Sequence, residues 1–260
     1  MISHVEDPSD PRLDPFRSLR DRDLAKEGLF ITEGFEAVRS LLASEIPIES
    51  VLVVPGRVDA VEPLAAGAEV LVADPELVKD TIGFDFHRGV VAAAHRPSPL
   101  SVGRLLIGAG HLAVLEGLND FENLGAIFRS ALALGVGGIL LDPTSADPLY
   151  RRCVRVSMGA TFLLPWARSH LWPGELGALK QAGFRLLAMT PASDATPIDE
   201  VPAGPRTALM LGSEGWGLSE QAMAYADLTV RIPIRVGVDS LNVGHAAAIG
   251  FHVLRPTGLT

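Results

Sequence analysis

Three features of the sequence predict an α/β fold in two domains, a small amino-terminal domain and a larger one with a mostly parallel sheet. The chain has 260 residues, enough for one large domain or two modest ones. Its composition is 48% hydrophobic and 20% charged, which supports packed cores and argues against disorder. Short buried strands alternate with helical segments along the chain, as they do in parallel α/β sheets.

A proline-containing segment divides the chain. Residues 96–101 read Arg-Pro-Ser-Pro-Leu-Ser and lack apolar periodicity, which is typical of a linker. We therefore expect an amino-terminal domain at residues 1–98, a linker at 99–104 and a second domain at 105–260.

The amino-terminal domain begins with a polar segment, residues 1–12, which contains proline and is expected to be flexible. A basic helix is predicted at 15–25, and a second helix at 34–43 because its apolar residues fall on one face. Short apolar strands are predicted at 29–31, 51–54, 69–72 and 89–94. This alternation describes a small α/β domain.

The second domain continues the alternation. Its predicted strands are 112–118, 138–141, 185–189, 207–211 and 228–234. Its predicted helices begin near Leu124, Pro148, Gly174, Ser219 and Val243. Because helices separate most of the strands, a mostly parallel sheet follows.

Composition excludes several classes of protein. No apolar run approaches the roughly 18 residues that span a bilayer, and the acidic amino terminus is unlike a signal peptide. Cys153 is the only cysteine, which excludes an internal disulfide and a cysteine metal cluster. The seven histidines show no H-x-x-x-H or H-x-H spacing, so no metal site is expected. A cytoplasmic location is the simplest expectation.

The net charge of −9 weakens the case for a nucleic-acid partner. Residues 1–100 hold 10 Lys and Arg against 18 Asp and Glu, whereas residues 101–260 hold 12 against 13. A stretch without acidic side chains, residues 149–170, contains Arg151, Arg152, Arg155 and Arg168. Such a local patch is enough to track phosphates, because exposed charges beyond about 10 Å are largely screened.

Two loops near the carboxyl end have the form of a ligand site. One is the Gly-rich turn at 212–218, which lets backbone amides approach a ligand. The other follows the strand at 228–234 and carries Ser240 and Asn242 before an Ala-rich helix. Loops at the carboxyl ends of neighbouring parallel strands form nucleotide-like sites. No G-x-G-x-x-G follows a strand, which argues against nicotinamide cofactors.

Three motifs in order carry a family resemblance: residues 119–129 (Asn-Asp-Phe-Glu-Asn-Leu-Gly-Ala-Ile-Phe-Arg), residues 155–165 (Arg-Val-Ser-Met-Gly-Ala, ending in Leu-Pro), and the pair of loops. They all lie in the part of the chain after Arg104, and the chain resembles the SpoU-type (TrmH-type) RNA 2′-O-ribose methyltransferases of the knotted SPOUT class. One departure is Phe121, where the family often has Pro. It changes the entry to the helix and not the chemistry.

The resemblance implies a fold and an activity. The fold is a trefoil-knotted methyltransferase domain at 105–260, preceded at 1–98 by an RNA substrate-binding domain similar to certain RNA-binding ribosomal proteins. The activity is methyl transfer from S-adenosylmethionine to a ribose 2′-hydroxyl of structured RNA. Ribosomal RNA is favoured as the substrate and transfer RNA is the other candidate. The resemblance also implies a homodimer.

The same resemblance assigns a catalytic set, namely Arg129, Asn123, Ser240 and Asn242. Local alternatives remain: Arg129 as a solvated helix residue, and Asn123 and Asn242 as helix caps. Since the pKa of arginine is above about 12, Arg129 is a poor base. We expect it to anchor phosphate and to stabilise negative charge on the 2′-oxygen.

The resemblance further assigns cofactor binding to Gly212, Glu214, Ile232 and Leu241. Glu214 can also be read as a carboxylate in the first turn of a helix. RNA phosphate contacts are expected from Arg155, Arg151 and Arg152. Base stacking competes with core or interface packing for Trp166, Trp172 and Trp216.

Two other classes of function stay open. A catalytically silent RNA-binding protein of the same fold is disfavoured by intact Arg129, Ser240 and Asn242, and an assay of cofactor binding would separate it from an enzyme. An unrelated Rossmann-type oxidoreductase lacks the glycine fingerprint and has only analogy of fold behind it.

Overall fold

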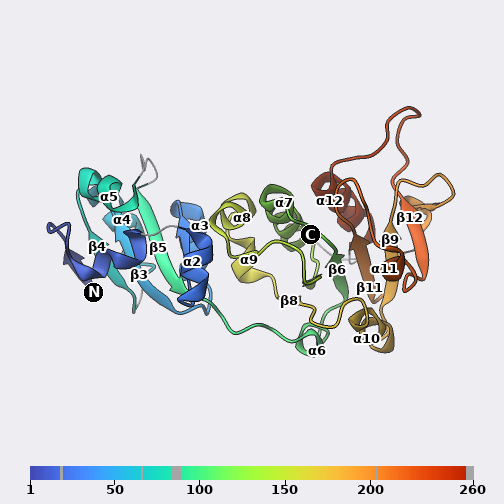
Figure 1. The fold of residues 1–260 in the computed structure, drawn as a ribbon, viewed down its shortest axis with the longest axis horizontal. Coiled ribbons are helices and arrows are strands. Elements are labelled where there is room, and N and C mark those ends of the chain that lie inside the picture. The colour runs from blue at the N-terminus through green and yellow to red at the C-terminus, as the bar shows by residue number, and fades with distance from the viewer. Residues whose placement is uncertain (18–19, 66, 84–88, 203, 256–260) are drawn as a thin grey trace. The chain divides into compact units, whose positions relative to one another are not determined.

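The structure, a computed structural model, describes residues 1–17, 20–65, 67–83, 89–202 and 204–255. It divides into two compact units (Figure 1). The first comprises Met1–Ser98 and Leu149–Leu163, and the second comprises Pro99–Pro148 and Leu164–Thr260. Both units are α/β.

The first unit is built on a five-stranded sheet of order β1-β4-β3-β5-β2. The strands are β1 (Ile2–His4), β2 (Leu29–Glu33), β3 (Ile48–Val53), β4 (Glu69–Val72) and β5 (Val90–His95). Strands β1, β4 and β3 are parallel, and β5 runs antiparallel to both β3 and β2. The helices of this unit are η1 (Pro11–Leu13), α1 (Asp14–Arg17), α2 (Asp21–Lys26), α3 (Phe35–Leu42), η2 (Pro55–Arg57), α4 (Val58–Val61), α5 (Pro75–Ile82), α8 (Arg151–Ser157) and α9 (Ala160–Leu163).

Two predictions for the amino-terminal segment are wrong. Residues 1–12 are not a flexible arm, because β1 pairs with β4 and Val5 is buried in the core. Pairing of β1 uses backbone groups, so its polar composition does not prevent it. The helix expected at 15–25 is instead two short helices, α1 and α2. Arg20 has an extended backbone (φ −79°, ψ 108°), which separates them.

The segment Leu149–Leu163 belongs to the first unit. Helix α8 contacts β2, and α9 contacts α3. The rings of Phe30 and Phe162 lie 5.5 Å apart, and the Ser40 hydroxyl donates to the Met158 carbonyl at 3.2 Å. The second domain expected at 105–260 therefore differs from the second unit by this segment. The residues expected to be a linker, 99–104, also belong to the second unit, and a helix, α6 (Val102–Leu105), begins among them.

The second unit is built on a seven-stranded sheet of order β10-β12-β9-β11-β6-β7-β8. The strands are β6 (His111–Leu115), β7 (Gly138–Leu141), β8 (Trp166–Arg168), β9 (Arg185–Met189), β10 (Thr196–Pro197), β11 (Thr207–Leu211) and β12 (Leu228–Arg231). All pairings in the sheet are parallel, which confirms the predicted architecture. The helices are α6 (Val102–Leu105), α7 (Phe121–Ala133), α10 (Glu175–Gln181), η3 (Ile198–Glu200), α11 (Glu220–Met223) and α12 (Val243–Leu254).

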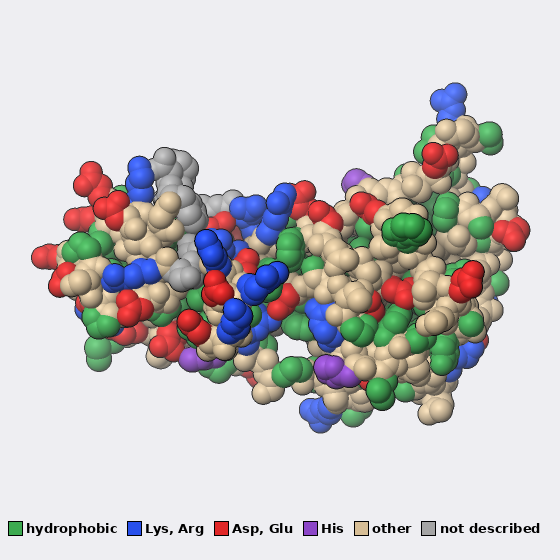
Figure 2. Space-filling model, viewed as in Figure 1, with side chains coloured by type: hydrophobic (Ala, Val, Ile, Leu, Met, Phe, Trp, Pro, Cys, Tyr) green, Lys and Arg blue, Asp and Glu red, His purple; other side chains and the backbone are tan. Residues whose placement is uncertain are grey.

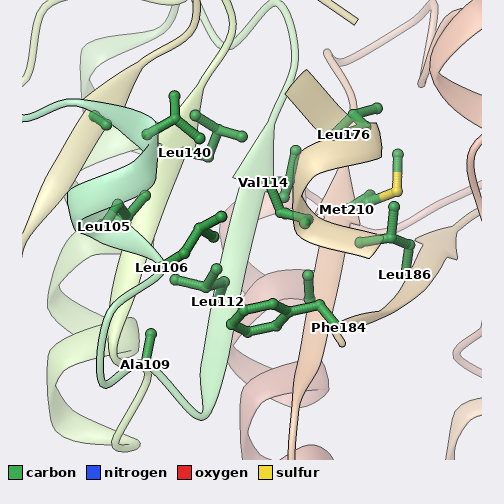
Figure 3. Packing of buried hydrophobic residues seen from close by; sticks show 14 of the residues in the cluster. Leu105, Leu106, Ala109, Leu112, Val114, Leu140, Leu176, Phe184, Leu186 and Met210 are labelled. Atoms are coloured by element: carbon green, nitrogen blue, oxygen red, sulfur yellow. The ribbon is translucent and has the colours of Figure 1, made fainter. Parts of the chain in front are cut away.

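Helices cover both faces of this sheet. One core lies between the sheet and α6, α10 and α11, where Leu112, Val114 and Met210 belong to one buried cluster (Figure 3). Helices α7 and α12 pack together on the other face (Figure 1). There α12 approaches β11 closely, because a Cβ at Gly250 would lie 2.5 Å from Leu209 Cδ2.

The topology brings two strand ends together at the middle of the sheet. Strands β6 and β11 are neighbours although about 90 residues separate them, and the chain leaves β6 and β11 toward opposite edges of the sheet. The loops after β6 and β11 therefore meet at a crevice, which is where open parallel sheets bind ligands.

Strand β12 ends at Arg231, three residues earlier than predicted. Among the described residues, no helix has the length and apolar character to cross a membrane.

Candidate active site

A cavity of about 300 Å³ opens at the carboxyl ends of β6 and β11. Residues of the first motif form one side and residues of the Gly-rich turn form the other. The lining consists of Gly117, Leu118, Asn119, Asp120, Asn123, Ser213, Glu214 and Trp216. The structure thus brings together motifs that lie about 90 residues apart in the sequence.

Helix α7 starts at Phe121 and is capped by Asp120, whose Oδ1 accepts from the Asn123 amide at 2.8 Å. The alternative of Asn123 as the cap is therefore wrong. Phe121 occupies the first helical position, where Pro is favoured because its missing N–H is not needed. The cap on Asp120 explains why the departure at Phe121 leaves the helix start intact.

Asn242 connects the loop before α12 with helix α7 and the Gly-rich turn. Its Oδ1 accepts from the amides of Gly244 (3.0 Å) and His245 (3.2 Å), which caps α12. Its Nδ2 donates to Asn123 Oδ1 at 2.8 Å and to Glu214 Oε1 at 2.9 Å. The capping interpretation of Asn242 is confirmed. Its role in the site stays a prediction, and the cap leaves Nδ2 to contact the first motif and the Gly-rich turn. Two hydrogen bonds from the Asn242 amide thus link α7 to the Gly-rich turn.

The Gly-rich turn is a closed loop. Gly217 donates its amide to the Ser213 carbonyl at 2.9 Å, and a Cβ at Gly212 would lie 2.0 Å from the Gly217 carbonyl carbon. Only glycine fits at position 212 in this loop. Glu214 lies inside the turn, six residues before α11 begins, so its interpretation as a first-turn helix carboxylate is wrong.

Glu116 binds Ser219, the residue just after this turn. The sequence did not predict this role for Glu116. Its carboxylate accepts from the Ser219 amide (2.8 Å), the Ser219 hydroxyl (2.8 Å) and the Trp172 indole N–H (2.7 Å). Ser219 in turn caps α11. The only sequence signal is an acidic residue directly after a buried strand.

Asp142 is a second residue that sequence reasoning missed. Burial by itself raises the pKa of its carboxyl, but hydrogen bonds from Ser145, Thr144 and the Gly117 amide lower the pKa below its usual value. The Gly117 amide donates to Asp142 Oδ1 at 3.1 Å, so this carboxylate holds the loop that follows β6. Asp142 comes directly after β7, as Glu116 comes after β6.

Arg129 and Ser240 are exposed, and neither side chain forms a hydrogen bond or ion pair within the described residues. Arg129 projects from α7 away from the buried Leu124 and Phe128, which leaves its guanidinium available to a ligand. Ser240 lies in the segment between β12 and α12, which extends away from the sheet (Figure 1).

Of the residues expected to hold the cofactor, Gly212 and Ile232 follow two strand ends, whereas Glu214 lies in the Gly-rich turn and accepts from Asn242. Gly212 is the first residue after β11, and Ile232 is the first after β12. Leu241 directly precedes Asn242 and is 38% exposed. Gly212 and Ile232 thus lie at the carboxyl ends of their strands, and Leu241 lies next to the residue that contacts the Gly-rich turn.

Arginines of the acid-free stretch fall into two groups. In the first unit, Lys and Arg side chains gather over α2, α3 and α8 (Figure 2), where Arg155 pairs with Glu33 at 3.3 Å and Arg151 with Asp21 at 3.6 Å. Arg152 is exposed on the same helix.

Arg168 belongs to the second group and is not part of a phosphate-binding patch. Its guanidinium donates to the carbonyls of Asp142 (2.9 Å), Ser145 (2.7 Å) and Ala146 (2.9 Å) in the second unit. It therefore supports the loop after β7. Within the described ranges, no group of three or more His, Cys, Asp or Glu side chains has the arrangement of a metal site.

Residues 111–252 match the SpoU rRNA methylase family. An uncharacterised tRNA/rRNA methyltransferase of Mycobacterium tuberculosis is 44% identical over 96% of this chain and 91% of that protein. The chain therefore belongs to the SpoU rRNA methylase family, as the three motifs predicted.

Two further relatives differ more in sequence. The 23S rRNA (guanosine(2553)-2′-O)-methyltransferase RlmP of Bacillus subtilis is 24% identical over 98% of this chain and 100% of that protein. The crystal structure of an AdoMet-bound rRNA methyltransferase from Sinorhizobium meliloti has a TM-score of 0.83 at 24% identity. It covers 100% of this chain and 99% of that one, and supports the same fold.

Proposed function

We propose that this protein transfers a methyl group from S-adenosylmethionine to a ribose 2′-hydroxyl of RNA. The observation that carries the proposal is the amide of Asn242, which joins Asn123 to Glu214 beside the cavity. This chain of polar groups offers both donors and acceptors to a ribose. Membership of the SpoU rRNA methylase family and the 2′-O-methyltransferase name of the Bacillus subtilis relative support the same reaction.

The residues present fit an adenosine-bearing cofactor. The close contact of Gly212 with Gly217 leaves backbone groups of the turn without covering side chains. Ile232 and Leu241 supply apolar surface for an adenine face. Backbone groups at Gly212, Ile232 and Leu241 would hold the adenosine. When bound, S-adenosylmethionine supplies a methyl group on a sulfonium that is already electrophilic.

The protein's own contribution is position and charge. Asn123, Asn242 and Glu214 would orient the ribose toward the methyl group that the cofactor supplies, an effect worth several kcal/mol. Glu214 is thus assigned to the ribose, and not to the cofactor as the resemblance implied, because it is hydrogen-bonded to Asn242. Arg129 anchors the adjacent phosphate and stabilises the negative charge that develops on the 2′-oxygen. Because arginine does not give up its proton at neutral pH, the hydroxyl proton leaves to phosphate or water. Ser240 adds a hydroxyl from the loop that carries Asn242.

The first unit is proposed to bind the RNA. Arg152 and Arg155 on α8 offer guanidinium groups to phosphates, and Arg151 adds a third on the same helix. The ion pair of Arg155 with Glu33 leaves its side chain 41% exposed, so phosphate can still reach it. We favour ribosomal RNA over transfer RNA as the substrate, because an accessory domain precedes the methyltransferase domain. The carboxyl-terminal trefoil knot likewise stays a prediction.

We further propose a homodimer. Leu132 on α7 and Ile249 on α12 are exposed by 38% and 39%, on two helices that pack against each other. An isologous interface over these helices, larger than about 1,000 Å², would cover them. Sedimentation that gives an active monomer at high micromolar concentration would rule this out.

The experiment that tests the function maps ribose methylations in RNA from cells with and without the gene. The proposal expects one or a few 2′-O-methyl positions to disappear on deletion. Binding of RNA by the purified protein, without binding of S-adenosylmethionine or methyl transfer, would instead support a catalytically silent RNA-binding protein.

A further inference from the structure

Trp216 is a large side chain of the site that methyl transfer itself does not use. It is 93% exposed. By contrast, Trp172 is half-buried and donates its indole N–H to Glu116 at 2.7 Å. Tryptophan is usually buried over much of its surface, so an exposed ring in a binding site is a face ready for a flat partner.

The turn that carries Trp216 has a constrained backbone. The ring is carried by the closed loop in which Gly217 donates to Ser213 and Gly212 contacts Gly217. Beyond the loop, Ser219 is fixed by the Glu116 carboxylate. The position of Trp216 is therefore set by a constrained turn that is tied at both ends.

Charge and size limit what can lie against this ring. Trp216 lines the cavity of about 300 Å³ together with Asp120 and Glu214. This volume far exceeds the roughly 30 Å³ of one water molecule, so an organic group fits. Two carboxylates repel a phosphate but accept hydrogen bonds from amino and imino groups. A nucleobase has those donors at its edge and a flat face for the indole.

We propose that Trp216 stacks on the base of the nucleotide whose ribose is methylated, an inference that rests on the proposed function. Asn123 and Glu214, which orient the ribose, line the same cavity as the indole, so one nucleotide can contact all three. Stacking on an aromatic ring tolerates any base, because every base has a π face. Trp216 thus binds the substrate and has no part in the displacement.

Steady-state methylation of total RNA from cells that lack the gene tests this role. Trp216→Ala should raise KM for RNA about tenfold or more, within the range of base–aromatic stacking. The kcat and the Kd for S-adenosylmethionine should stay close to wild type. Trp216→Phe should restore most of the lost affinity, because the phenyl ring still stacks. Ile107→Ala is the matched control. Ile107 is 73% exposed and precedes β6, at the amino ends of the strands, so removing its side chain should change neither KM nor kcat.

Three outcomes separate the possibilities. If wild-type protein methylates the RNA and Trp216→Ala has an unchanged KM, the stacking role is overturned and the proposed function stands. If Trp216→Ala sediments as a smaller species than wild type, the ring belongs to a protein–protein interface and the proposal is again overturned. If wild-type protein transfers no methyl group to any RNA, the proposed function itself fails.

Discussion

Replacing Asn242 by serine separates the two contacts of this side chain. Serine keeps an oxygen that can cap α12 and removes Nδ2, which donates to Asn123 at 2.8 Å and to Glu214 at 2.9 Å. Ser and Asn are nearly equal as caps, so the change of cap should alter the free energy of unfolding by less than about 1 kcal/mol. The two lost bonds, one of them to a carboxylate, are bonds of the folded chain, so the free energy of unfolding should fall by roughly 2 kcal/mol, the low end appropriate to a site open to water. Asn123 and Glu214 then lose the group that holds them, and a misplacement of about 1 Å in the ribose site costs on the order of 100-fold in kcat/KM.

Urea denaturation and transfer of a tritiated methyl group into RNA measure the two effects separately. Asn242→Ala should lose the same activity and about 1 kcal/mol more stability, because it also removes the cap. Ser101→Ala is a control, since Ser101 caps α6 away from the site (Arg104 amide to Oγ, 3.3 Å). It should lose stability and keep activity. Wild-type kcat/KM in Asn242→Ser would refute the role of the amide in orienting the ribose.

Three further predictions test other parts of the site. Arg129→Ala should lower the rate by two or more decades, roughly 3 kcal/mol, and Arg129→Lys should recover little; calorimetry should find unchanged affinity for S-adenosylmethionine. Glu116→Ala loses the acceptor for three donors and should raise the Kd for the cofactor more than Trp172→Phe, which loses one bond; equal Kd values would contradict the role of Glu116 in holding the Gly-rich turn. Burial lowers the pKa of His111, so the unfolded chain binds its proton more readily and stability should fall as pH drops below about 6.5. His111→Phe should flatten this dependence in urea titrations.

Strands buried on both faces were predictable, and the edges of the sheets were not. The predicted bounds of β7, β9 and β11 agree with the structure, because continuous apolar runs between glycine and polar residues have few other solutions. Strand β1 escaped prediction because its sequence, Ile-Ser-His, has no pattern of its own. Its pairing depends on β4, nearly 70 residues away, which no local window contains.

The candidate site was likewise predictable only in part. Asn123, Glu214 and Asn242 could be named from motifs, but their hydrogen bonds join positions 119 and 28 residues apart in the sequence. Only the fold brings these groups together. Glu116 and Asp142 lie outside any motif and act on backbone amides and neighbouring side chains. A sequence does not reveal such supports, because an acidic residue after a strand also suits a solvated loop.

The most direct test of the proposed function is the chemical identity of the product. Purified protein, S-adenosylmethionine with a labelled methyl group and total RNA from cells lacking the gene are incubated, and the RNA is digested to nucleosides for mass spectrometry. The proposal predicts that the label appears in a 2′-O-methylnucleoside and is absent with Arg129→Ala. Label on a base, or a 2′-O-methylnucleoside formed equally well by Arg129→Ala, would contradict it.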